Sequence, residues 1–307
     1  MRVLKIGAKV QSAKVGDLCL VFSGAWQWNR FGFVTAALAY DSPGSIGLMA
    51  KTTKLHERQI IALPEDTPFH PAQWAGFSLR YVTAFGNWKV AHGTFRLMLT
   101  EQEYPHPYVV SWGGGVAWAQ LELAKLSGYQ CIMFTSDENR MAALKEKGIA
   151  AIDRRPLAAI HFSQQRYQTD VVYKKNYTAA EQLFLQTVAQ ATNGEMASIL
   201  IDHIGEPVFR ASLKALAQPS VITTSGWKLG MHLSTMRAFE SGYWHQHINT
   251  SYARYPEAIE AIQFAQTHNW IPPFPERIYQ FDEIPQLAQD YADGKTSYFP
   301  IFQVNPL

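Results

Sequence analysis

Residues 108–140, YVVSWGGGVAWAQLELAKLSGYQCIMFTSDENR, decide the fold of this 307-residue chain. An apolar run at 108–112 is followed by three glycines and then by apolar residues at helical spacing, Val116, Ala119, Leu123 and Leu126. A second apolar run at 130–135 leads into another helical pattern at 138–147. This order of strand, glycine turn, helix and strand predicts the first half of a dinucleotide-binding unit, whose helix N-terminus presents unpaired N–H groups to a pyrophosphate.

The glycine turn is shorter than the usual dinucleotide fingerprint, G-x-G-x-x-G or G-x-G-x-x-A. Here Gly113 and Gly115 are followed by Ala117, one residue earlier than the usual spacing. A bend between a strand and a helix also requires glycine for steric reasons alone. From the order of the surrounding elements, we predict that Gly113, Gly114, Gly115 and Val116 contact the pyrophosphate of a dinucleotide.

The end of the second strand indicates which dinucleotide is bound. In NAD-binding units an acidic residue at this point binds the adenosine ribose hydroxyls. This chain instead has Thr135 and Ser136, with Arg140 shortly after them. These groups suit a 2′-phosphate, because arginine forms charge-assisted hydrogen bonds to phosphate oxygens. We therefore predict NADPH rather than NADH as the cofactor. The alternative is that Ser136 only caps the next helix and that Arg140 is solvated.

The composition excludes several other classes of protein. The formal net charge is +2, from 27 Lys and Arg against 25 Asp and Glu, and no basic cluster is longer than two residues, so we expect no nucleic-acid binding. Cys19 and Cys131 lie in separate apolar runs, as buried reduced thiols do, and two cysteines cannot form a four-cysteine zinc site. The chain shows neither a signal peptide nor a run long enough to span a membrane. We expect a cytoplasmic protein that holds no metal.

The first part of the chain has a β-rich pattern. Residues 2–22 predict two short strands, and residues 47–64 predict another pair that ends at Pro64. At 71–85 the period changes from two to 3.6, with aromatic residues on one helical face, Trp74, Phe77, Tyr81 and Phe85. A β-rich domain therefore precedes the dinucleotide-binding unit, and this helix marks the boundary between them.

An irregular polar and aromatic stretch interrupts the alternation of strands and helices. Residues 154–176 show no clear period and predict an inserted loop. Thr178 and Glu181 have the spacing of a capping box, which predicts that the next helix opens there.

The later strands complete a parallel sheet with helices on both faces. Strands are expected at 150–152, 197–202 and 220–224, with helical patterns between them. Nucleotides bind such sheets outside the C-terminal ends of the strands. The residues that follow the later strands are therefore further candidates for cofactor contacts: His203, Gly205, Thr224, Ser225 and Gly226.

Several stretches of the chain resemble the medium-chain dehydrogenase/reductase superfamily. Near the N-terminus, VLKIGAKVQSAKVGD is similar to a corner of its GroES-like catalytic domain, and GLMAKTTKLHERQIIALPEDT is similar to a strand pair of that domain. VAWAQLELAK is similar to the first Rossmann helix, and ILIDHIG and SVITTSG are similar to later parts of the Rossmann domain. The resemblance continues into YPEAIEAIQFAQTHNWIPPFPERIYQFDEIPQLAQDYADGK, so it covers nearly the whole chain.

The resemblance implies an α/β protein with a doubly wound Rossmann sheet and a β-rich GroES-like catalytic domain. On this pattern the catalytic domain comprises 1–88 and 268–307, and the Rossmann domain comprises 89–267. The family's first domain begins upstream of the point matched by Arg2, so we expect this domain to be N-terminally incomplete. The zinc-independent quinone oxidoreductase and crotonyl-CoA reductase-like branch is the most similar part of the superfamily, and its lack of metal ligands agrees with the cysteine count.

This branch implies NADPH-dependent hydride transfer to the activated double bond of a small molecule, an enoyl thioester or a quinone-like acceptor. Tyr40, Asp41 and Tyr81 are the candidate catalytic groups, and Thr83, on the interdomain helix, is a candidate cofactor contact. Each tyrosine could equally be a core or rim residue. Two other functions stay open: a carbonyl or alcohol oxidoreductase, and a non-catalytic nucleotide-binding or scaffold relative with a decayed active site.

The segment 244–252, WHQHINTSY, predicts the assembly state. In the resembling family the outer strand of the nucleotide domain pairs with its symmetry mate, and this segment carries no Lys, Arg, Asp, Glu or Pro to prevent such pairing. We therefore predict a two-fold homodimer with His245 and His247, or their neighbours, close to the interface. The two histidines should point the same way, but they lack the further ligands that a metal requires. The alternative is that a loop of the same chain covers the strand.

Overall fold

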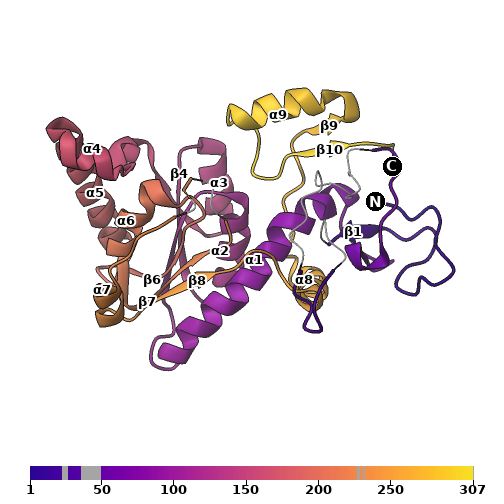
Figure 1. The fold of residues 1–307 in the computed structure, drawn as a ribbon, viewed down its shortest axis with the longest axis horizontal. Coiled ribbons are helices and arrows are strands. Elements are labelled where there is room, and N and C mark those ends of the chain that lie inside the picture. Colours follow the sequence, from indigo (N-terminus) through magenta and orange to yellow (C-terminus); the bar gives the residue numbers. More distant parts are fainter. Residues whose placement is uncertain (23–26, 36–49, 227–228, 231, 307) are drawn as a thin grey trace. The chain divides into compact units, whose positions relative to one another are not determined.

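The computed structural model describes residues 1–22, 27–35, 50–226, 229–230 and 232–306. By their internal packing the residues of the chain form two units, 1–85 with 253–307 and 86–252. Figure 1 labels the helices and strands of both units. The second unit contains the glycine turn, and its sheet determines where a nucleotide would bind.

The second unit is built on a six-stranded parallel sheet with the strand order β5-β4-β3-β6-β7-β8 (Figure 1). Its strands are β3 (Tyr108–Trp112), β4 (Gln130–Thr135), β5 (Ala150–Asp153), β6 (Ala197–Ile201), β7 (Leu216–Thr224) and β8 (His245–Asn249). Its helices are α2 (Gly115–Leu126), α3 (Glu138–Glu146), α4 (Gln164–Thr169), α5 (Val171–Ala191), α6 (Glu206–Lys214), α7 (Arg237–Gly242) and the C-terminal part of α1 (Pro71–Met98). The chain order runs outward from β3 and β6 in both directions, which is the doubly wound Rossmann arrangement that the sequence predicted.

Helices cover both faces of this sheet. Figure 1 shows α4, α5 and α6 on one side of the strands and α2 and α3 on the other. On the α5 side, the ring of Trp112 stacks on Phe184 with the centroids 4.8 Å apart, and the ring of Phe134 lies 5.1 Å from Phe184. Phe184 is fully buried, and burying a side chain of this size contributes about 2–3 kcal/mol. This aromatic contact therefore fixes α5 against β3 and β4.

Residues 154–176 do not form the irregular loop that we expected. They form η2 (Arg155–Ile160), α4 and the beginning of α5, which starts at Val171. Asp170 caps α5, because its Oδ1 accepts a hydrogen bond from the N–H of Tyr173 at 2.8 Å. Thr178, which we expected to open the helix, lies inside it. The stretch is helical because its aromatic side chains pack on one another, a tertiary effect that periodicity does not report.

The first unit contains two small sheets. β1 (Cys19–Val21) pairs antiparallel with β2 (Ile60–Ala62), and β9 (Ile278–Gln280) pairs in parallel with β10 (Ile301–Gln303). The helices of this unit are the N-terminal part of α1, α8 (Tyr255–His268), α9 (Ile284–Ala292), and the short η1 (Glu57–Gln59) and η3 (Phe281–Glu283). In 2–22, where two strands were expected, there is β1 and a single bridge between Arg2 and Leu18. No helix in the described part of the chain is long and apolar enough to cross a membrane.

The aromatic face predicted for 71–85 packs the N-terminal part of α1 into the first unit. Phe77 and Tyr81 stack with their centroids 5.4 Å apart, and Tyr81 lies 4.7 Å from Trp270. Phe85 contacts Phe264 of α8 at 5.8 Å. This packing groups α8 with the first unit, so the units divide after residues 85 and 252, whereas we expected divisions after 88 and 267.

Candidate nucleotide-binding site

The strand order of the second unit reverses between β3 and β6. In open α/β sheets ligands bind at such a point, outside the carboxyl ends of the strands. The glycine turn follows β3. Strands β4, β6 and β7 run parallel to β3 and end at the same edge of the sheet, so the residues that follow them lie at this edge too. The structure therefore collects at one edge most of the predicted cofactor contacts: Gly113, Gly114, Gly115, Val116, Thr135, Ser136, His203, Gly205, Thr224, Ser225 and Gly226.

The glycine turn offers space and hydrogen-bond donors to an anion. The N–H of Gly113 donates to the carbonyl oxygen of Phe134 at 3.0 Å, which fixes the turn against β4. Gly114 has a φ of 156°, and a Cβ added there would have no heavy atom within 4 Å. Gly114 is also the N-cap of α2, so no side chain caps the first N–H groups of this helix. The shortened turn therefore keeps the features that a pyrophosphate requires.

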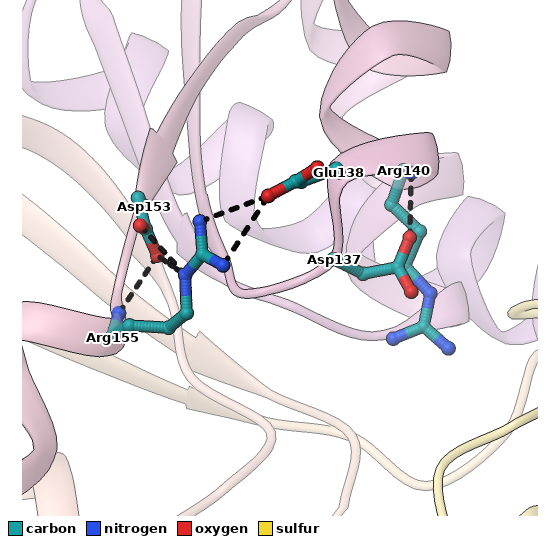
Figure 2. Close-up of polar contacts among 5 residues, drawn as sticks. All are labelled: Asp137, Glu138, Arg140, Asp153 and Arg155. Carbon is teal, nitrogen blue, oxygen red and sulfur yellow. Dashed lines mark hydrogen bonds and ion pairs between the residues drawn. The ribbon is translucent and has the colours of Figure 1, made fainter.

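The structure identifies the residue that caps α3, directly after β4. Asp137 caps α3, because its Oδ1 accepts a hydrogen bond from the N–H of Arg140 at 2.8 Å. Ser136 is not the cap, so the alternative reading of this serine is wrong. Thr135 is buried, whereas Ser136 is partly exposed at the edge. The guanidinium of Arg140 is directed away from Glu138 in Figure 2.

A second arginine lies at the same edge and was missed by the sequence reading. The Nε of Arg155 donates to both carboxylate oxygens of Asp153, at 2.8 and 3.0 Å, and its terminal nitrogens lie 3.4 Å from Glu138 (Figure 2). Hydrogen bonds from the backbone and the side chain of Arg155 lower the pKa of Asp153. The contact to Glu138 is exposed to solvent, so another anion can replace it. The signal was visible as two consecutive arginines directly after the third strand.

A hydrogen-bond network lies behind the ends of β6 and β7. The Nδ1 of His203 accepts from the N–H of Ser225 at 3.2 Å, so Nε2 carries the ring hydrogen and donates to Oε1 of Gln120 at 2.7 Å. The amide of Gln120 donates to Oδ1 of Asn87. The amide of Asn87 donates in turn to the carbonyl oxygen of Thr224 at 3.0 Å. Each donor meets an acceptor, which assigns one tautomer to the ring and one orientation to each amide.

The centre of this network is Asn87, which is fully buried on α1. Besides the contacts above, it accepts from the hydroxyl of Thr223 and donates to Oγ1 of Thr250, both at 2.8 Å. The network thus connects α1 and α2 to the ends of β6, β7 and β8. The sequence reading named His203 but missed Asn87 and Gln120, whose signal is a polar residue on a helical face that is otherwise apolar.

Two adjacent residues of this region have pKa values displaced in opposite directions. Burial lowers the pKa of His203 to about 4, so its ring is neutral at pH 7. Burial raises the pKa of Asp202 to about 6, although the N–H groups of Ile204 and Gly205 donate to its Oδ1 at 2.8 and 3.0 Å. The other oxygen of Asp202 is buried and has no hydrogen-bond partner among the described residues. At neutral pH this carboxylate is therefore poorly solvated.

Of the three catalytic candidates, the structure describes only Tyr81. Tyr40 and Asp41 fall outside the described residues. Tyr81 is fully buried and stacked in the aromatic core of the first unit, so we withdraw it as a proton donor. Thr83 is also buried, on the part of α1 that belongs to the first unit. A tyrosine at helical spacing with other aromatic residues proved to be a core residue.

The two histidines of β8 point the same way, as their spacing predicted. The Nδ1 of His245 and the Nε2 of His247 lie 3.0 and 2.9 Å from the same oxygen of Glu240. The side chain of His245 is 2% exposed, so it faces the interior of its own unit. In the parts of the chain that the structure describes, no three or more His, Cys, Asp and Glu side chains are grouped so that they could hold a metal ion.

The structure was also compared with known proteins. No family model and no curated protein sequence matches the chain. Among solved structures, a variant of the crotonyl-CoA carboxylase/reductase AntE in complex with NADP is similar, with a TM-score of 0.70, 18% identity, and coverage of 98% of this chain and 75% of that one. The alcohol dehydrogenase from the archaeon Aeropyrum pernix has a TM-score of 0.67, 15% identity, and coverage of 99% and 80%.

A third similar structure is matched over a smaller part of its length. AibC has a TM-score of 0.57 and 18% identity over 78% of this chain, and this chain spans 61% of the length of AibC. At such identities the likeness concerns the fold. The chain therefore has the two-domain fold of the alcohol dehydrogenases and crotonyl-CoA carboxylase/reductases, a Rossmann domain with a GroES-like domain.

Proposed function

We propose that this chain is an NADPH-dependent, zinc-independent oxidoreductase that reduces the activated double bond of an enoyl thioester or a quinone-like small molecule. The observation that carries the proposal is the carboxyl edge of the Rossmann sheet, where an open glycine turn lies at the point of strand reversal. The complex of AntE with NADP supports a nicotinamide cofactor. When bound, that cofactor supplies the hydride, and the protein supplies binding and orientation.

The phosphates would be held at two places along this edge. The first N–H groups of α2, beside Gly114, would bind the pyrophosphate. Ser136 and Arg140 would bind the 2′-phosphate, as the sequence suggested, and Arg155 would join them. Asp153 would keep Arg155 in position while its terminal nitrogens exchange Glu138 for the phosphate. A preference for NADPH would then depend on two arginines.

His203 would position the loop at 224–226 and would not take part in proton transfer. Its Nδ1 accepts from the N–H of Ser225 and its Nε2 donates to Gln120, so both ring nitrogens are already engaged. Its lowered pKa keeps the ring neutral at pH 7, which preserves both hydrogen bonds. The same network holds Thr224 through Asn87, so the loop after β7 is fixed on both sides.

A carbonyl or alcohol oxidoreductase is the second candidate function. The observation that favours it is the presence of alcohol dehydrogenases among the similar structures, from Aeropyrum pernix and, as putative enzymes, from Sinorhizobium meliloti. Both candidates use the same nucleotide edge, so the acceptor decides between them.

Two measurements test the proposal. Calorimetric titration should show NADPH binding more tightly than NADH, and Gly114→Val should abolish both, because its side chain would fill the space beside the turn. The absorbance of NADPH at 340 nm should then fall in the presence of a 2-enoyl thioester or a quinone and stay constant with an aldehyde. Oxidation by the aldehyde alone would favour the second candidate. Binding without any turnover would support a non-catalytic nucleotide-binding protein.

We also propose that the chain forms a two-fold homodimer through β8. This strand is at the edge of the sheet, and its segment contains no charged residue apart from histidine. Several large apolar side chains beside it are exposed: Met236, Phe239, Tyr243 and Trp244. Pairing of two copies would cover both the strand edge and these side chains.

A further inference from the structure

The first unit contains a cavity with aromatic and cationic walls. Its volume is about 590 Å³, and the lining residues that matter here are Trp28, Phe31, Tyr255, Arg30, Arg58 and Arg254. All of them belong to the first unit, whereas the residues of the nucleotide edge belong to the second. A cavity of this size is in the range that binds small molecules.

The aromatic wall is held in place by side chains behind it. The rings of Trp28 and Tyr255 lie 4.1 Å apart at 61°, and Phe22 lies 5.7 and 5.2 Å from them. Phe22 is buried, whereas Phe31 is 54% exposed at the rim. The wall is therefore rigid and still presents ring surface to a ligand.

The turn that carries Phe31 is also fixed. The side-chain oxygen of Asn29 accepts from the N–H groups of Phe31 and Phe33, at 2.9 and 3.2 Å. Gly32 has a φ of 84°, and a Cβ added there would lie 2.6 Å from Cδ of Pro256. The turn is thus seated directly on the beginning of α8, and its shape does not depend on a ligand.

The charges of the cavity are unbalanced. Arg254 forms an ion pair with Glu257 at 2.8 Å. The guanidinium of Arg58 lies over the ring of Trp28 at 5.2 Å, and that of Arg30 lies over Phe31 at 4.6 Å. Within the described part of the chain, no carboxylate pairs with either of these two arginines. Two cations are therefore held at aromatic rings beside the cavity, without a matching carboxylate from the residues that the structure describes.

We propose that this cavity binds the phosphorylated purine of a nucleotide. The purine would stack on the exposed ring surface of Phe31 and Trp28, since stacking on aromatic side chains is the common mode of base recognition. The phosphates would take the paired donors of Arg30 and Arg58, whose geometry matches phosphate oxygens. The nucleotide is either free or the nucleotide end of a coenzyme A thioester. As a site for a free nucleotide, the cavity goes beyond the proposed oxidoreductase function; as a site for a coenzyme A thioester, it rests on that function.

The test is a calorimetric titration of ADP into the full chain carrying Gly114→Val, whose side chain fills the space beside the glycine turn of the Rossmann edge. No NADPH is present, because NADPH is itself a phosphorylated purine nucleotide and would compete for the cavity. Arg30→Gln with Arg58→Gln should weaken ADP binding on the order of tenfold or more, because two charge-assisted contacts are lost. The matched control is Lys51→Gln with Lys54→Gln, which removes the same charge from exposed residues of the same unit that do not line the cavity. We expect the control to bind ADP within about twofold of the Gly114→Val protein.

Further ligands separate the contribution of the purine from that of the phosphates, and they show whether the nucleotide is free or part of coenzyme A. Adenosine and pyrophosphate should each bind at least about tenfold more weakly than ADP, because each offers only one of the two groups. Coenzyme A that binds more tightly than ADP would identify a thioester carrier, and the reverse would identify a free nucleotide. The proposal is overturned if the Gly114→Val protein gives no heat with ADP, if the arginine and lysine variants weaken equally, or if pyrophosphate alone matches ADP.

The outcome is separable from that of the proposed function. If NADPH does not bind to the wild type, the oxidoreductase proposal fails, and the ADP titration, which contains no NADPH, is unaffected. The difference in ADP affinity between the arginine double variant and the lysine double variant then still reports binding in the cavity of the first unit, because neither pair of residues lies in the Rossmann unit.

Discussion

Replacing Asp202 by Asn should stabilise the protein at neutral pH and change how its stability depends on pH. Asp202 is 4% exposed, and burial raises its pKa from 3.8 to about 6. A difference of about two pKa units corresponds to about 3 kcal/mol. Because the folded-state pKa is raised, the contribution of Asp202 to the free energy of unfolding is fully present below pH 3.8 and is lost as the pH rises through about 6. Above pH 6 the ionised carboxylate therefore lowers the free energy of unfolding.

His203 has the opposite effect over nearly the same range. Its pKa is lowered from 6.5 to about 4, so its contribution is fully present above pH 6.5 and is lost as the pH falls through about 4. Between pH 4 and 6 the changes that the two residues make to the free energy of unfolding nearly cancel in the wild type. Asp202→Asn removes one of them, so the stability of the variant should fall by about 3 kcal/mol between pH 6.5 and 4.

The net gain at pH 8 is smaller than the full electrostatic term. Asn keeps an oxygen that accepts from the N–H groups of Ile204 and Gly205. It also places an amide N–H₂ where the unpartnered oxygen was, and an unsatisfied buried donor costs about 1–2 kcal/mol. We expect a gain of about 1–2 kcal/mol at pH 8 that becomes a loss of about 1–2 kcal/mol at pH 4, where the electrostatic term is gone and the cost of the unsatisfied amide donor stays.

Urea unfolding at pH 4, 5, 6, 7 and 8 measures this effect in wild type and variant. Subtracting the two curves removes the contribution of all other titrating groups. Glu146→Gln, at an exposed position on α3 of the same unit, is the control and should give a difference that does not vary with pH. If the wild-type and Asp202→Asn curves run parallel from pH 4 to 8, the assignment of a buried and poorly solvated carboxylate is wrong.

Four further outcomes are expected. Arg140→Ala and Arg155→Gln should each reduce the preference for NADPH over NADH by about 1–2 kcal/mol in calorimetric titration, and an unchanged ratio in both would remove them from the 2′-phosphate subsite. Asn249→Pro should shift the sedimentation coefficient from dimer to monomer, because the N–H of Thr250 donates to β7 and that of Asn249 therefore points to the open edge, where proline removes it; a monomeric wild type would contradict the homodimer. Phe184→Ala should lower the free energy of unfolding by about 3–5 kcal/mol, against less than about 0.5 for the exposed Val172→Ala. Elemental analysis of untagged protein should find less than one zinc per chain, and one tightly held equivalent would refute zinc independence.

The sequence by itself determined the second unit because its signals are local. The three glycines at 113–115 mark a strand-to-helix turn, and the alternation of apolar runs with helical periods led directly to a doubly wound sheet. Likewise the aromatic spacing of 71–85 predicted a buried helix face, although the helix itself extends to Met98. Each of these signals depends on residues a few positions apart, which is the range over which backbone conformation and amphipathic burial are set.

Only the tertiary structure decided which polar groups meet. Asn87 and Gln120 are 33 residues apart, and Gln120 and His203 are 83 apart, yet they form one network. Arg155 forms hydrogen bonds to Glu138, which is 17 residues away, and the two histidines of β8 both contact Glu240. A hydrogen bond or an ion pair depends on the position and direction of two atoms to within about an ångström. That position is set by how helices and strands pack, whereas the sequence specifies only which groups are available to be paired.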